Sequence, residues 1–106
     1  MLESGKVSEL ELYTLLCLSE GPTHGLGIAR WLFENIGLYT SPGTLYPLIK
    51  RMAKAGWIRE GEGPEPVDGN AKRRRYMALE AAGLNILQNE AERMEKVLGM
   101  VRKIKG

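Results

Sequence analysis

The sequence predicts a mainly α-helical fold with a small β-hairpin and a long C-terminal helix. Three observations support this prediction. Up to residue 56, three segments place apolar residues at helical spacing between cap or turn residues. Two short β-type segments follow, separated by a stretch rich in Gly and Pro. The chain beyond residue 80 contains no proline and many helix-forming residues.

The length and composition are those of one ordinary domain. The chain has 106 residues, of which 43% are hydrophobic and 26% are charged, and this is enough to build one core. Its apolar runs are shorter than the roughly 18 residues needed to cross a bilayer, and its N-terminus lacks a secretory pattern. We therefore expect a cytoplasmic protein with no membrane partner. Cys17 lies in an apolar run, where we expect a buried thiol.

The first predicted helix begins at a capping box and runs to about Ser19. In this motif the Ser8 and Glu11 side chains each bind an unpaired backbone N–H of the first turn. The apolar residues of the helix cover most of its circumference, so we expect it to be central to the core or partly buried by another chain. They are Leu10, Leu12, Tyr13, Leu15, Leu16 and Leu18. Gly21 and Pro22 end the helix.

The second predicted helix begins between Thr23 and Gly25 and reaches about Asn35, with Gly37 as its C-terminal cap. A short β-type tripeptide follows at residues 38–40. Ser41 and Pro42 then begin the third helix, as an N-cap residue followed by proline at the first helical position.

The third predicted helix carries one buried face and ends at Ala55 and Gly56. Its apolar stripe has i, i+3, i+4, i+7 spacing and consists of Leu45, Leu48, Ile49 and Met52. Pro47 lies inside the helix, but the hydrogen bond it removes belongs to the first turn, where the cost is tolerable.

The β-hairpin has predicted strands at residues 57–60 and 73–79, joined by a loop at residues 61–70. Three helices followed by such a hairpin have the layout of a winged helix-turn-helix. We therefore divide the chain into a winged helix-turn-helix DNA-binding domain at residues 1–80 and a C-terminal dimerisation helix at residues 81–106.

The C-terminal helix carries a heptad pattern that predicts dimerisation. Apolar residues recur with 3-4-3-4-3 spacing, and Val97 and Ile104 widen the seam. Gly99 either weakens the helix or permits close approach of another backbone. The predicted dimer interface combines this seam with the first helix and consists of Leu12, Leu16, Leu84, Leu87, Ala91, Met94, Leu98 and Val101.

Positive charge is concentrated in the middle of the chain. The formal net charge is only +2, but residues 41–79 carry eight basic and four acidic side chains. The third helix and the hairpin hold these basic residues, and a winged helix presents both to DNA. The candidate DNA-binding residues are Ser41, Thr44, Tyr46, Lys50, Arg51, Lys54, Lys72, Arg73, Arg74 and Arg75. Among them, Thr44, Tyr46 and Lys50 are predicted to reach the groove.

Several of these residues have a purely structural alternative. The basic residues could be ordinary solvated charges, and Tyr46 could pack against the strand that precedes the hairpin. Trp31 and Trp57 are more typical of core or interface positions than of ligand cages. His24, at a helix entry, could be only a turn or capping residue.

Catalysis has little support in this sequence. The chain has one histidine and one cysteine, and it shows neither a glycine-rich phosphate loop nor a cluster of residues with metal-ligand spacing. We therefore predict no enzyme activity, no cofactor and no metal.

From residue 10 to residue 83 the chain resembles the PadR family of transcriptional regulators. The resemblance rests on Glu20 to Gly25, on Gly43-Thr44-Leu45-Tyr46-Pro47 in the third helix, and on Arg74-Arg75-Tyr76 near the hairpin exit. It implies a dimeric winged-helix DNA-binding protein, usually a repressor, of the short class with a single C-terminal helix. The chain departs from the family at Leu26 and Met77, where the family has aromatic residues, and at Glu80, where it has threonine.

These observations together predict a homodimeric, sequence-specific transcriptional regulator whose partners are double-stranded DNA and a second copy of itself. The resemblance further implies release by a small hydrophobic or phenolic effector. We place the effector pocket at the dimer interface, among Trp31, Met94 and Met100. The alternative is a protein-interaction module that dimerises through its C-terminal helix without specific DNA binding.

Overall fold

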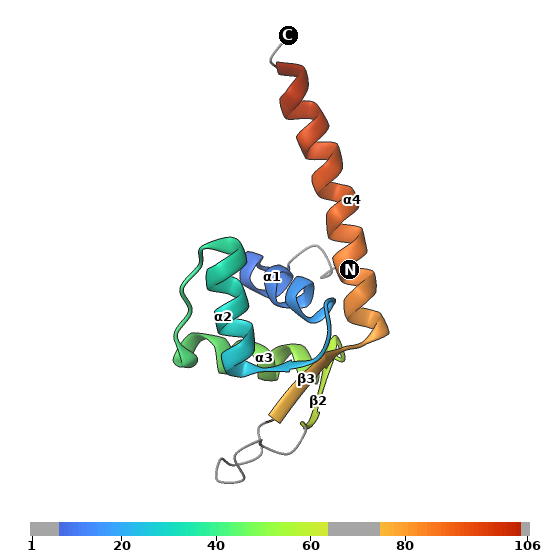
Figure 1. Ribbon diagram of the computed structural model, residues 1–106. Helices are drawn as coiled ribbons and strands as arrows, with labels where there is room; N and C mark the ends of the chain where they lie inside the picture. The colour runs from blue at the N-terminus through green and yellow to red at the C-terminus, as the bar shows by residue number, and fades with distance from the viewer. Residues whose placement is uncertain (1–6, 64–74, 105–106) are drawn as a thin grey trace.

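The computed structural model describes residues 7–63 and 75–104. Within them the order of elements is α1 (Glu9–Leu18), β1 (Thr23–His24), α2 (Gly25–Ile36), α3 (Pro42–Lys54), β2 (Ile58–Glu62), β3 (Arg75–Leu79) and α4 (Ala81–Ile104). Three helices and a small sheet form a body from which α4 projects, and the molecule is 59 Å long (Figure 1). The predicted winged helix-turn-helix with a long C-terminal helix is confirmed.

The helix ends follow the predicted cap residues. The Ser8 hydroxyl accepts from the backbone N–H of Glu11 at 3.1 Å, and the Ser8 N–H donates to the Glu11 carboxylate at 2.9 Å. The Ser41 hydroxyl accepts from the N–H of Thr44 at 3.3 Å. Gly37 has φ +78°, a left-handed conformation that favours glycine after a helix. These local signals therefore fix the helix boundaries.

The sheet has three antiparallel strands in the order β1-β3-β2. The predicted hairpin supplies β2 and β3. The third strand, β1, was not predicted, and it pairs Thr23 with Met77 and His24 with Tyr76. The tripeptide at residues 38–40 forms no strand and instead links α2 to α3. Strand formation here depends on an available edge, because β3 offers its free side to residues 23–24.

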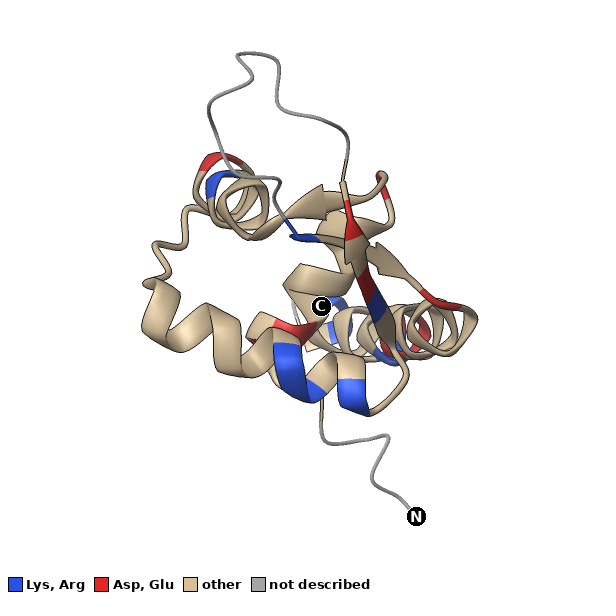
Figure 2. Cartoon of the chain, turned by 90° about the horizontal axis from the view of Figure 1, so that it is seen from below, with Lys and Arg blue, Asp and Glu red and all other residues tan. Residues whose placement is uncertain are grey.

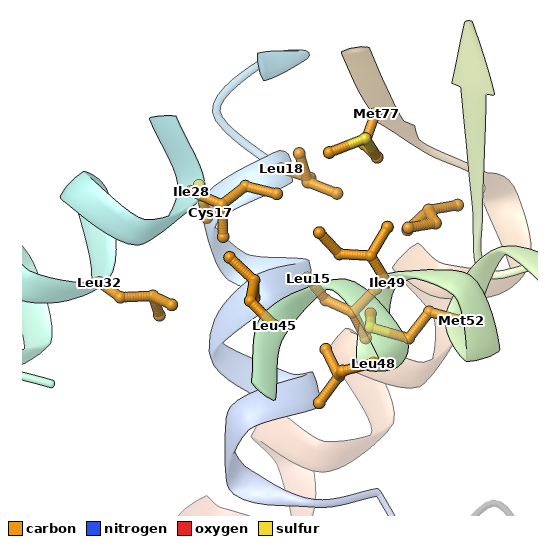
Figure 3. Close-up of a cluster of buried hydrophobic side chains, with 11 residues drawn as sticks. Leu15, Cys17, Leu18, Ile28, Leu32, Leu45, Leu48, Ile49, Met52 and Met77 are labelled. Atoms are coloured by element: carbon orange, nitrogen blue, oxygen red, sulfur yellow. The ribbon is translucent and has the colours of Figure 1, made fainter. Parts of the chain in front are cut away.

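The core lies between α1, α2, α3 and the sheet (Figure 3). All four residues of the predicted α3 stripe are buried in it. Pro47 lies inside α3 without ending it. Cys17 is buried as expected, and burial, followed by the charge of Glu20, raises the pKa of its thiol to about 11.

The helix α4 is attached to the body through its N-terminal half only. A Cβ at Gly83 would lie 2.3 Å from the Trp57 carbonyl oxygen, so glycine permits the close approach of α4 to the chain before β2. Leu87 packs against the core, whereas the C-terminal half of α4 stands clear of the body (Figure 1). The exposed apolar residues of α4 are Leu84, Met94, Val97, Leu98, Met100, Val101 and Ile104.

Candidate nucleic-acid interface

The outward face of α3 is polar and basic. The helix contains three basic residues and no acidic one, while its buried stripe anchors it to the core. Thr44, Tyr46, Lys50 and Lys54 are all exposed. Figure 2 looks onto the side of the molecule that carries α3 and the strands. A helix fixed on one side and basic on the other is suited to enter a DNA groove.

The first turn of α3 is ordered by its own hydroxyl groups. The Ser41 hydroxyl caps the helix and also donates to the Thr44 hydroxyl at 3.2 Å. Both residues are exposed, and the N-terminal end of a helix carries a partial positive charge. This turn can therefore present backbone and hydroxyl groups to a phosphate.

Tyr46 lies against the beginning of α2. A Cβ at Gly25 would lie 2.5 Å from the Tyr46 hydroxyl, so only glycine leaves room for the ring at this position. The Tyr46 side chain is still half exposed. The ring is thus held on one side and remains accessible on the other.

Arg51, a predicted phosphate contact, forms an ion pair within the chain. Its guanidinium binds the Glu11 carboxylate, with Nε and Nη2 at 3.3 and 3.2 Å from Oε2. The Glu11 side chain is buried, and Arg51 is its partner on α3. The same carboxylate caps α1 through its other oxygen. Arg51 therefore links α3 to α1, and its side chain remains 64% exposed.

The described part of the wing is electrically balanced. Arg75 binds Glu60 across the sheet at 3.3 Å, and Arg59 lies 3.5 Å from Glu80. Figure 2 shows acidic and basic residues next to each other along the strands. The other predicted wing contacts, Lys72, Arg73 and Arg74, lie outside the described residues. Among the described residues, the unbalanced positive charge of this face is therefore on α3.

His24 is the N-cap of α2, which agrees with its structural alternative. Its Nδ1 accepts from the Gly27 N–H at 3.0 Å. Its ring makes an edge-on contact with Tyr76 of β3, with 5.3 Å between ring centroids. The capping histidine therefore also ties the start of α2 to the wing, a role that its position in the sequence did not indicate.

Comparison with known proteins identifies the family. The model of the Transcriptional regulator PadR-like family matches residues 14–89, which include α2, α3, the sheet and the start of α4. The chain belongs to this PadR-like family. Its members are DNA-binding transcriptional regulators, in agreement with the basic face of α3.

Solved PadR-like structures have the same fold. A PadR family transcription regulator from Clostridium difficile superposes with a TM-score of 0.80 at 21% identity, over 93% of this chain and 100% of that one. A PadR family regulator from Eggerthella lenta gives 0.68 at 26% identity, over 90% and 86% of the two chains.

A curated relative is much longer than this PadR-like chain. It is an uncharacterized 37.1 kDa protein in transposon TN4556 of Streptomyces fradiae, 26% identical over 96 residues. The match covers 91% of this chain but only 26% of that relative. This chain therefore spans about a quarter of the relative's length.

The predicted dimer positions of this PadR-like chain differ in exposure. Leu12 is 8% exposed and is already buried within one chain, whereas Leu16 of α1 is 40% exposed. Of the α4 positions, Leu87 is partly buried against the core, and the others are exposed. Leu12 is therefore a core residue of the single chain, and Leu16 is the position on α1 that remains accessible.

The predicted effector residues come from α2 and from the exposed part of α4. The Trp31 indole on α2 donates to the Glu20 carboxylate at 3.1 Å. Met94 and Met100 are 46% and 68% exposed on the projecting part of α4 (Figure 1).

Glu90 is a residue whose environment the sequence did not reveal. It is 6% exposed on α4, and it accepts a hydrogen bond from Arg93 at 2.8 Å. That hydrogen bond raises the pKa of the Arg93 guanidinium. The heptad pattern assigns the neighbouring Ala91 to the apolar seam. It does not indicate that Glu90, an acidic residue, is buried.

The residues that the structure describes contain no group of three or more His, Cys, Asp or Glu side chains able to hold a metal ion. Among them, no helix is long and apolar enough to cross a membrane.

Proposed function

We propose that this PadR-like chain is a homodimeric, sequence-specific DNA-binding repressor of the cytoplasm. The observation that carries the proposal is the construction of α3. Its apolar stripe is buried in the core, and its outward face combines exposed Tyr46 with exposed Lys50 and Lys54 and contains no acid. This is the arrangement of a recognition helix, whose rigid attachment positions polar side chains for a major groove.

The candidate DNA-binding residues divide into two roles. We assign contacts with base edges to Thr44, Tyr46 and Lys50. The others bind phosphates and set the position of the protein on DNA. We assign this role to Ser41, Lys54, Lys72, Arg73, Arg74 and Arg75. Arg51, whose side chain is 64% exposed beside Glu11, is kept in this set.

A second copy would cover the apolar face of α4. Val97, Leu98 and Val101 are each about half exposed, at 50%, 47% and 54%, and such contiguous apolar surface favours association. We therefore keep the division into a DNA-binding domain at residues 1–80 and a dimerisation helix at residues 81–106. A symmetric dimer would read two related half-sites about one turn of DNA apart, roughly 34–36 Å.

An electrophoretic mobility shift with the DNA upstream of the gene for this protein tests DNA binding. The expected result is a shifted band that unrelated DNA of equal length does not compete away. Affinity should fall steeply with salt, because each phosphate contact releases counterions. Lys54→Met should reduce the slope of log affinity against log salt by about two per dimer, since each copy loses one contact.

Lys96→Met is the matched control, because Lys96 is an exposed lysine on α4 far from α3. This variant should bind like the wild-type protein. Tyr46→Phe should instead relax the sequence preference at one base pair of each half-site while leaving the salt slope unchanged. Equal binding to every DNA sequence by the wild-type protein would contradict the assignment of α3 as a sequence reader.

The protein-interaction module is the competing function, and the same experiment separates the two. A folded dimer that binds no DNA even at low salt would favour the protein-interaction module.

Control by an effector is the last part of the proposal. Binding of a small hydrophobic or phenolic compound among Trp31, Met94 and Met100 of a dimer should change the tryptophan fluorescence. A flat response across a broad panel of aromatic compounds would remove the support for this pocket.

A further inference from the structure

The single histidine of the chain makes a hydrogen bond that depends on its charge. His24 is the N-cap residue of α2, and its Nδ1 accepts from the Gly27 N–H at 3.0 Å. A ring nitrogen that carries a proton is a donor and cannot accept this bond. We propose that His24 is a positioning residue for Tyr46, and that protonation of its ring releases the start of α2 together with the Tyr46 side chain.

The His24 ring is held between the sheet and α2. His24 pairs with Tyr76 of β3, and the two rings meet edge-on with 5.3 Å between their centroids. A Cβ at Gly27 would collide with the Thr23 hydroxyl, so β1 lies directly against the first turn of α2. The first N–H groups of a helix have no partner within the helix. Loss of the cap therefore leaves this packed turn without its side-chain acceptor.

Tyr46 rests on the turn that His24 caps. Gly25 follows His24 in the chain and is buried, and a Cβ at Gly25 would lie 2.5 Å from the Tyr46 hydroxyl. The Tyr46 ring therefore has no free space on the side of α2. Its other side is open, because the side chain is 50% exposed. A displacement of the turn at Gly25 would therefore change the position of Tyr46.

The charges around His24 disfavour a positive ring. The charged and titratable groups that contact the ring or line a hollow with it are Tyr46 and Lys50 of α3, Glu60 of β2, and Arg75 and Tyr76 of β3. Glu60 already has a cationic partner, since Arg75 binds it at 3.3 Å. The first turn of α2 contains no acid, and the N-terminal end of a helix carries a partial positive charge. Protonation of His24 therefore adds a positive charge where the helix end and Lys50 are already positive.

Acid should therefore act on the fold through this one side chain. An ordinary histidine takes up a proton near pH 6.5. Because the proton and the Gly27 N–H compete for Nδ1, the capped helix is favoured above this pH and becomes less stable as the pH falls through it. The chain contains one histidine, so a side-chain titration between about pH 5.5 and 7.5 is assigned to His24.

NMR of the full wild-type chain between about pH 7.5 and 5.5 tests the release without DNA. The histidine ring signal reports protonation, the Gly27 amide reports the cap, and the Tyr46 ring signals report the position of that side chain. All three should shift with one midpoint, while the Val97 methyl signals on α4 stay constant. A ring that stays neutral throughout, or one that titrates while the Gly27 or Tyr46 signals stay constant, would overturn the proposal.

Urea denaturation of variants measures the contribution of the cap. In the wild-type protein, the same decrease in pH should lower the folding equilibrium constant by about tenfold, the usual effect of losing an N-cap. His24→Asn should show no such change, because asparagine is a good N-cap that does not titrate in this range. His24→Ala should be less stable than the wild-type protein at the higher pH and should not respond to pH. Parallel pH profiles of the wild-type protein and His24→Asn would overturn the proposal.

The effect on DNA rests on the proposed function, in which Tyr46 contacts a base edge. The quantity to measure is the ratio of affinities for the upstream DNA and for unrelated DNA, because the charge of a protonated ring strengthens binding to all sequences alike. At low pH this ratio should fall about tenfold in the wild-type protein and stay constant in His24→Asn. Absence of DNA binding at every pH would contradict the proposed function and leave the NMR result in place. An unchanged ratio in a protein whose Tyr46 signals do shift would overturn the role of His24 in sequence reading.

Discussion

One carboxylate connects two distant parts of the chain. The Glu11 side chain caps α1 through one oxygen and binds Arg51 of α3 through the other. Because Glu11 is buried and Arg51 is mostly exposed, solvent screens part of the attraction. The two hydrogen bonds between Arg51 and Glu11 nevertheless hold the turn of α3 that contains Lys50 against α1.

Substitution of Glu11 measures this connection. Glu11→Ala should reduce the free energy of unfolding by about 2 kcal/mol, since it removes a helix cap and an ion pair. Glu11→Gln retains an acceptor for the cap and should cost about half as much. Urea denaturation of these variants and of Arg51→Met gives the values. Full additivity in the Glu11→Ala, Arg51→Met double variant would show that the two side chains do not interact.

The buried thiol gives a prediction about pH. Burial raises the pKa of Cys17 from 9.0 to about 11, so the unfolded chain ionises first as pH rises. The buried, protonated thiol therefore adds to the free energy of unfolding below pH 9. This contribution, on the order of 2 kcal/mol, is lost between pH 9 and 11.

Other groups titrate in the same range, so Cys17→Ala is the reference. The wild-type protein should lose more stability than this variant between pH 9 and 11 in chemical denaturation. Parallel pH profiles for the two proteins would contradict the burial of the thiol.

At the scale of elements, two glycines of α4 have opposite surroundings. Gly83 lies against the Trp57 carbonyl, whereas among the described residues nothing lies within 4 Å of a Cβ placed at Gly99. Gly83→Ala should destabilise the protein by about 1–3 kcal/mol, because α4 must move away from the body. Thermal denaturation followed by circular dichroism measures the change.

Gly99→Ala is the matched control for this helix. In a single chain the added methyl meets no neighbour, so the substitution should stabilise α4 by about 1 kcal/mol through helix propensity. A destabilised dimer would instead show that a second backbone approaches α4 at Gly99. An unaffected Gly83→Ala variant would contradict the close packing at Trp57.

Elements were predictable from the sequence where their signals were local. The Ser8 and Ser41 caps and the α3 stripe each lie within a few residues, and all were identified correctly. The strand β1 was missed because two residues are too few to show an alternating pattern, and it exists only because β3 offers an edge.

The candidate site was less predictable, since its groups come from distant parts of the chain. Arg51 is 40 positions from Glu11, so local spacing gave no sign of their ion pair, although Arg51 is exposed as the spacing predicts. A hollow of about 440 Å³ is likewise lined by residues of α2, α3, β2 and β3. Such juxtapositions follow from packing, which a single sequence does not encode in its local pattern.

At the scale of the whole molecule, the apolar face of α4 predicts the assembly state. Light scattering after gel filtration should give the mass of a dimer for the full chain. Leu98→Glu together with Val101→Glu should give a monomer, because each copy would bring charge into the apolar contact. Lys96→Glu, on the same helix, should remain dimeric. A monomeric wild-type protein at micromolar concentration would contradict the dimer.

The uncovered end of α4 has a consequence for how the protein responds to its own abundance. A single chain presents one recognition helix, whereas two joined chains hold a second one at high effective concentration beside the adjacent half-site. If a second copy completes α4, the amount of paired protein rises with the square of the chain concentration when pairs are scarce. Occupancy of the operator would then rise as a threshold rather than in proportion, so that a modest change in synthesis or degradation switches the gene.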